Sequence, residues 1–244
     1  MTSEAAATPI PRKGRVWVIL LLSVFALGIG YAIVSIATKE PGREVVRVDG
    51  IGPSQEIFSG IPQEGERLGS ADAPVSIQVF ADMQCGSCRE DFLATIPRLT
   101  EDYARPGDAK LLLRHYSIAQ NQLELGFFGA EAAAEQGYGW QYTYLFFRNQ
   151  DEAERFGVGD ELMETLAGSI AGLEIPEWKK FLEENSGNEG AIAQKLEAYA
   201  DLGTDLGIRT RPAMIVSGPK GTQTLQDGPS LAQVERAIGE VGGS

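Results

Sequence analysis

Cysteine and histidine are scarce in this chain of 244 residues. It contains two cysteines, Cys85 and Cys88, and one histidine, His115. A structural zinc site needs more Cys and His ligands than these side chains supply, so the sequence argues against a metal centre within the chain. A small exported domain held by disulfides would carry more cysteines at wider spacing. The two cysteines therefore form a local pair rather than a scaffold.

Positive charge is also in short supply. The 21 Lys and Arg residues face 34 Asp and Glu residues, which gives a net charge of -13. Nucleic-acid binding needs a basic face that neutralises phosphates, so this composition argues against a nucleic-acid partner. The N-terminus is the exception, because residues 1–15 carry Arg12, Lys13 and Arg15 against Glu4.

A long apolar run follows this basic stretch. Residues 16–38 contain no charged side chain, and as a helix they would span about 34 Å, enough to cross a bilayer. The positive-inside rule predicts a transmembrane signal-anchor with residues 1–15 in the cytoplasm. We therefore expect a single-pass protein of the cell membrane whose folded domain is extracytoplasmic. A cleaved signal peptide ending near Ala37 is the alternative, although its apolar region is usually shorter, about 7–15 residues.

The remainder of the chain predicts a linker and one folded domain. Residues 39–66 are rich in Gly, Pro and charge, which is typical of a linker, and residues 67–244 would form the domain. Val75–Phe80 and Lys110–Tyr116 are short apolar runs that predict strands. Between them, an amphipathic helix follows the cysteines, with these apolar residues on one face: Phe92, Leu93, Ile96 and Leu99.

The middle of this domain has a different pattern. Apolar residues recur at helical spacing through about residues 123–205, which predicts a helical subdomain. Strand patterns return at Ala213–Val216 and Thr222–Leu225, and a last amphipathic helix starts near Ser230. This order predicts an α/β fold with a thioredoxin-like core and an inserted helical subdomain.

The two cysteines lie where a helix begins, directly after a strand. Unpaired N–H groups at a helix N-terminus favour an anion, so Cys85 is expected to react as a thiolate. Cys88, one turn later, can attack the same sulfur and release a client bound there as a mixed disulfide. A purely structural disulfide is the competing interpretation, but so small a loop stabilises a fold little. The pattern favours redox exchange without a cofactor beyond the dithiol.

Several segments resemble the DsbA-like thioredoxin-fold family. Phe80–Cys88 reads Phe-Ala-Asp-Met-Gln-Cys-Gly-Ser-Cys and is similar to the family's active-site segment. Arg209–Val216 resembles the family's cis-proline loop and the strand after it. Leu68–Val75 is similar to the lead-in of many members, and Arg114–Tyr116 and Ala132–Gly137 resemble segments around the helical insertion.

The resemblance implies a membrane-anchored bacterial enzyme that exchanges disulfides with exported proteins. It implies a quinone-linked membrane oxidase as the redox partner. It also implies a cis bond at Arg211-Pro212, with both residues shaping a groove where the client's backbone pairs as an added strand. The competing hypothesis is a chaperone-like peptide-binding module whose disulfide is incidental.

The active-site segment also departs from the family. Gly86 and Ser87 stand between the cysteines, where members with strong oxidising power often carry a histidine. Arg211 stands where many relatives carry Thr or Val, and we expect its guanidinium near the Cys85 sulfur, where a cation favours the thiolate. Asp82 is a further candidate for tuning the sulfur. The choice between oxidase, isomerase and reductase stays open. A lone histidine on a strand, such as His115, is more often packed than catalytic.

Overall fold

The structure is a computed structural model that describes residues 47–116, 125–156, 158–187 and 190–242. The predicted signal-anchor at residues 16–38 lies outside the described residues. Over the ranges that are described, no helix combines the length and the apolar character needed to pass through a bilayer. The anchor therefore stays a prediction from the sequence.

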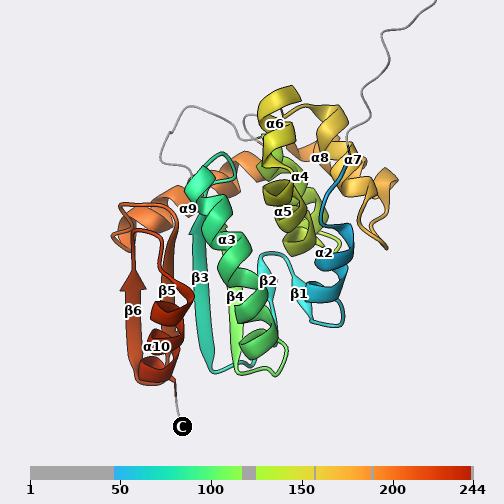
Figure 1. The fold of residues 1–244 in the computed structure, drawn as a ribbon. Coiled ribbons are helices and arrows are strands. Elements are labelled where there is room, and N and C mark those ends of the chain that lie inside the picture. The colour runs from blue at the N-terminus through green and yellow to red at the C-terminus, as the bar shows by residue number, and fades with distance from the viewer. Residues whose placement is uncertain (1–46, 117–124, 157, 188–189, 243–244) are drawn as a thin grey trace, which may run out of the picture. The chain divides into compact units, whose positions relative to one another are not determined.

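The described strands form one mixed sheet. Parallel pairing joins β3 to β4, and antiparallel pairing joins the other neighbours. β3 lies between β4 and β5, at the centre of the sheet (Figure 1). In spatial order the strands are β1 (Gln63–Glu64), β2 (Arg67–Leu68), β4 (Ala109–His115), β3 (Val75–Ala81), β5 (Ala213–Gly218) and β6 (Gly221–Leu225).

Two helices cover one face of this sheet, α3 (Gly86–Leu99) and α10 (Leu231–Val241) (Figure 1). A short π-helix, η1 (Thr100–Ala104), extends α3. Both helices bury an apolar stripe against the alternate inward residues of the strands, such as Ile77 and Val79. Burying one side chain of this size contributes about 1.5–3 kcal/mol, so this layer is a main source of stability.

The opposite face is covered in part by α9 (Ala191–Asp205). Phe80 and Tyr116 meet edge to face there, with ring centroids 5.8 Å apart. Gly203 of α9 lies directly against the Tyr116 ring, and a Cβ at this position would come within 2.5 Å of it. The glycine therefore lets the helix approach the sheet closely, at some cost in helix propensity.

The chain between β4 and β5 is helical, as the apolar spacing predicts. α5 is buried along most of its length and joins two cores, because Trp140 and Phe147 pack with the sheet layer whereas Tyr142 and Phe146 pack among the other helices. Figure 1 shows α4 to α8 gathered beside the sheet. Besides α9 the helices are α4 (Leu125–Ala134), α5 (Gly139–Arg148), α6 (Gln150–Phe156), α7 (Asp160–Gly168) and α8 (Ile175–Asn185).

The predicted linker over residues 39–66 is wrong from residue 51 onward. Residues Ile51–Phe58 form a helix, α2, and β1 follows it. Phe58 is 1% exposed and packs against the rings of Trp140 and Tyr144, with centroids 6.4 and 5.9 Å away. The Gly and Pro residues of this segment lie in turns and in the first turn of α2. The segment is not a free linker, because its apolar residue Phe58 packs against α5.

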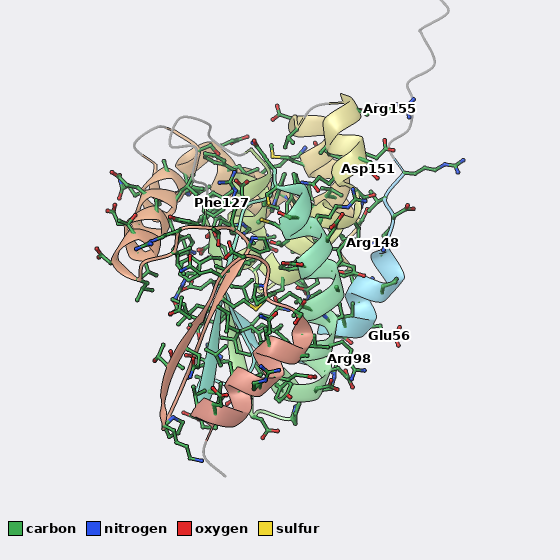
Figure 2. All side chains as sticks on the ribbon, turned by 60° about the vertical axis from the view of Figure 1, so that its left-hand side comes forward. Glu56, Arg98, Phe127, Arg148, Asp151 and Arg155 are labelled. Atoms are coloured by element: carbon green, nitrogen blue, oxygen red, sulfur yellow. The ribbon has the colours of Figure 1, made fainter. Side chains whose placement is uncertain are left out.

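The burial of Phe58 gives a direct test of this correction. Replacing Phe58 by Ala should lower the free energy of unfolding by about 3–5 kcal/mol, because a large aromatic leaves a cavity between α2 and α5. Glu56, exposed on the same helix (Figure 2), is the matched control, and its change to Ala should alter stability by less than about 0.5 kcal/mol. Urea unfolding followed by fluorescence measures both; equal midpoints for F58A and the parent protein would restore the linker interpretation.

Candidate active site

Cys85 and Cys88 lie where β3 passes into α3. Cys85 is the N-cap of this helix, and its Sγ accepts a hydrogen bond from the backbone N–H of Cys88 at 3.1 Å. The Ser87 hydroxyl lies 3.1 Å from the same sulfur. Cys85 is partly exposed and Cys88 is buried, and both are free thiols in the structure. Solvent can therefore reach Cys85 but not Cys88.

The acidity of the Cys88 thiol is set by its surroundings. Burial raises the pKa of the Cys88 thiol far above its ordinary value, the hydrogen bond with Cys85 raises it further, and the charges of Cys85 and Asp82 add to this. The backbone N–H of Asp82, which points at the Cys88 sulfur from 3.5 Å, opposes the shift in part. Cys88 is therefore a neutral thiol at physiological pH.

The predicted cis bond at Arg211-Pro212 is present in the structure. The pairing of β3 with β5 fixes where this loop lies. Phe80 is the register partner of Ala213 in an antiparallel ladder, so the residues after Phe80 run beside the residues before Ala213. Asp82 and Arg211 therefore meet at the same end of the sheet, next to the cysteines.

Asp82 and Arg211 form an ion pair at this meeting point. The Nε of Arg211 lies 2.7 Å from Oδ2 of Asp82, whose side chain is only 3% exposed, compared with 26% for Arg211. The backbone N–H of Gln84 donates to the other carboxylate oxygen at 2.9 Å. In the structure the charge partner of Arg211 is Asp82, and the expected position of its guanidinium near the Cys85 sulfur stays a prediction. A buried carboxylate without a cation would cost several kcal/mol, which explains the pairing.

Comparison with known proteins decides the family. A family model described as thioredoxin matches residues 63–237. The chain belongs to the thioredoxin family. A curated relative, the probable disulfide bond formation protein D of Bacillus cereus, is 25% identical over 166 residues, which cover 67% of this chain and 74% of the relative.

Solved structures agree with this assignment. The crystal structure of oxidised BdbD from Bacillus subtilis matches with a TM-score of 0.60 at 21% identity, and covers 75% of this chain and 96% of its own. MdbA, a thiol-disulfide oxidoreductase from Corynebacterium diphtheriae, matches with a TM-score of 0.56 at 20% identity, and covers 75% of this chain and 98% of its own. The resemblance noted from the sequence is confirmed: this is a DsbA-like thiol:disulfide oxidoreductase.

The DsbA-like site has supporting residues that sequence analysis missed. Gln150, 3% exposed at the start of α6, donates a hydrogen bond from Nε2 to the carbonyl of Met83 at 2.9 Å. Asp151, labelled in Figure 2, pairs through both carboxylate oxygens with Arg89 of α3. The first contact joins α6 to the loop before Cys85, and the second joins α6 to α3. Nothing in the sequence signals them, because a Gln-Asp step at a helix start usually faces solvent.

His115 is a packed residue, in agreement with the sequence analysis. Its ring meets Phe127 at 4.8 Å between centroids. Burial lowers the pKa of His115 to about 3, and the charge of Lys195 acts in the same direction. The imidazole is therefore neutral at any physiological pH and does not act as an acid or base. Among the described residues, no group of three or more His, Cys, Asp or Glu side chains is arranged to hold a metal ion.

The contact between Ser87 and Cys85 predicts a shift in redox potential. Ser87→Ala removes a hydroxyl that can donate to the Cys85 thiolate, so the reduced form is stabilised less. A donor of this kind contributes about 1 kcal/mol, which makes the potential more negative by about 20 mV. Equilibration in glutathione buffers measures this shift, with the exposed Ser59→Ala as control. A potential that rises or does not move would show that the hydroxyl makes no contact with the thiolate.

Proposed function

We propose that this protein catalyses disulfide exchange with exported proteins through Cys85 and Cys88. The observation that carries the proposal is the asymmetry of the pair. Cys85 is partly exposed at a helix N-terminus and receives a backbone hydrogen bond, whereas Cys88 is buried and its pKa is strongly raised. Cys85 would react with the client, and Cys88 would resolve the mixed disulfide.

In the oxidising direction the reaction begins from the disulfide between the two cysteines. A client thiolate attacks the Cys85 sulfur, the bond between Cys85 and Cys88 breaks, and Cys88 leaves with the electron pair and takes up a proton. A second client thiolate then attacks the client sulfur of the mixed disulfide, and Cys85 leaves as a thiolate. The client gains a disulfide and the enzyme becomes a dithiol. The same steps in reverse reduce a client disulfide. Isomerisation occurs when the Cys85 thiolate opens a client disulfide, another client thiolate attacks the client sulfur of the mixed disulfide, and Cys85 leaves as a thiolate.

Clients would bind beside the cis-proline loop. The backbone before Pro212 is the proposed pairing strand for a client segment, and Arg211 would border the same groove. Gly86 and Ser87 are exposed next to Cys85, so they would contact the client near the reacting sulfur. Relatives named for disulfide bond formation support this reading.

Location and partner follow from the sequence. The uncharged run at residues 16–38 and its basic flank would anchor the protein in the cell membrane, with the domain on the extracytoplasmic side. The dithiol left after each oxidation must be reset, and a quinone-linked membrane oxidase, as the resemblance implies, is the proposed partner. The dithiol itself is the only redox group that the reaction needs.

Trapping of clients tests the mechanism. Cys88→Ser should accumulate mixed disulfides between Cys85 and exported proteins, because this variant has no second thiol in the chain that could release them. Non-reducing gels of cells that express this variant would show slower-migrating adducts that disappear with reductant. Cys85→Ser is the matched control and should form none. A C88S variant without adducts would contradict the exchange mechanism, and client binding that persists in C85S would favour the chaperone-like module.

Fractionation tests the location. We expect the full chain in the membrane fraction after high-salt washing, with residues after 38 open to protease added outside the cell. The physical reason is the apolar run, which is long enough to span the bilayer. A mature N-terminus mapped near residue 38 would show a cleaved signal peptide instead.

A further inference from the structure

One edge of the sheet has no partner among the described strands. β6 is the last strand of the sheet and pairs on one side only, with β5 (Figure 1). The residues from Gly221 to Thr224 are exposed, and Leu225 is half-buried. An exposed strand edge presents N–H and C=O groups to which the backbone of a further strand can pair.

β6 lacks the features that usually keep a strand edge from pairing. Its residues, Gly221–Leu225, include no charged side chain and no proline. The described ladder with β5 runs residue for residue, without a bulge that would twist the strand away. Proteins commonly protect an exposed edge with one of these features. Their absence from β6 favours a contact at this edge.

The hairpin geometry decides which backbone groups of β6 are free. The turn between β5 and β6 closes with Gly218 opposite Gly221, and a pair that closes a two-residue turn is hydrogen-bonded. Hydrogen-bonded and non-hydrogen-bonded pairs alternate along an antiparallel ladder. Thr222 and Thr224 therefore direct their N–H and C=O groups away from β5, whereas Gln223 directs its groups toward it.

The sequence of β6 is symmetric about Gln223, because a threonine lies on either side of it. An antiparallel second copy of the strand would place Thr222 opposite Thr224 of that copy, and Gln223 opposite its own equivalent. Every outward backbone group of the two threonines would then find a partner, and the Thr–Thr pairs would add side-chain contact. A twofold interface uses the same patch on both copies, so this symmetry favours a second copy over an unrelated strand.

The charges that flank β6 fit the same partner. Lys220 precedes the strand and Asp227 follows it, and both are exposed. Antiparallel pairing about Gln223 brings Lys220 of each copy toward Asp227 of the other, and opposite charges across a strand pair are favourable. The backbone N–H of Asp227 donates to Oγ1 of Thr210 at 2.9 Å. This end of the interface therefore adjoins the cis-proline loop.

We propose that two copies of this chain associate through β6, paired antiparallel about Gln223, so that their sheets become continuous. The inference does not depend on the exchange function. It specifies a register that cross-linking can measure. Gln223 and its equivalent would form a non-hydrogen-bonded pair, whose Cα atoms lie about 4.5 Å apart. A disulfide spans Cα distances of about 4.4–6.8 Å, so Gln223→Cys should link the two copies.

The cross-linking test uses the full chain in detergent. Cys85→Ser and Cys88→Ser are included, so that the introduced cysteine is the only thiol. After mild oxidation, Q223C should give a covalent dimer on non-reducing gels that reductant removes. Thr224→Cys is the matched control on the same strand, because equivalent Cα atoms there lie about 7–8 Å apart on the diagonal. Its dimer yield should be at least about fivefold lower, and mixing it with Thr222→Cys should restore the cross-link.

Sedimentation of the parent protein measures the association without a cross-link. Thr224→Pro removes an outward N–H and leaves the pairing with β5 in place, so the dimer dissociation constant should rise at least about tenfold. A parent protein that stays monomeric would overturn the inference, as would an unchanged constant in T224P. Equal cross-linking of Q223C and T224C would show random collision and contradict the register. Adducts of Q223C with other proteins in cells, in place of the dimer, would assign the edge to another partner and also overturn it.

Discussion

The antiparallel pairing of β3 with β5 is the constraint on which the active site depends. β3 delivers the cysteines at its C-terminal end, and β5 begins immediately after the cis-proline loop. The register, with Phe80 opposite Ala213, brings the Asp82 carboxylate and the Arg211 guanidinium together at the end of the sheet where the cysteines follow. A shift of one residue would reverse the faces of the strand and separate Asp82 from Arg211. The ladder thus sets which charged side chains meet at this end of the sheet.

The helical block stabilises this arrangement from the other side. Met83, between Asp82 and the cysteines, is 0% exposed and packs among the inserted helices. Its carbonyl is held by Gln150, and Arg89 of α3 is held by Asp151. The loop before Cys85 is therefore held in place by contacts with the inserted helices, including the hydrogen bond from Gln150 of α6. A reactive sulfur needs such support, because a loosely held thiol would not stay at the helix N-terminus that favours its anion.

A half-buried charge network joins the helices to the sheet away from the cysteines. Lys195 of α9 lies 2.5 Å from Glu131 of α4 and 3.6 Å from Glu66, which also pairs with Arg114 of β4 at 2.6 Å. Burial lowers the pKa of Lys195, but the attraction of these carboxylates outweighs it, so the net shift is upward. The Lys195 ammonium therefore stays charged at neutral pH. Its geometry holds α4 and α9 in one position against β4.

The sequence alone determined the strands around Cys85, the final helix and the helical content between β4 and β5, because local apolar periodicity reports which face of an element is buried. It also identified Cys85, Cys88 and the cis-proline loop, because these features are contiguous in the chain. Tertiary structure alone decided the role of residues 51–66, the clamp from Gln150 and the pairing of Asp82 with Arg211. The physical reason is the same in each case. These contacts join positions far apart in the chain. The local sequence around a polar residue or a short apolar segment does not indicate which distant residue it will contact in the folded protein.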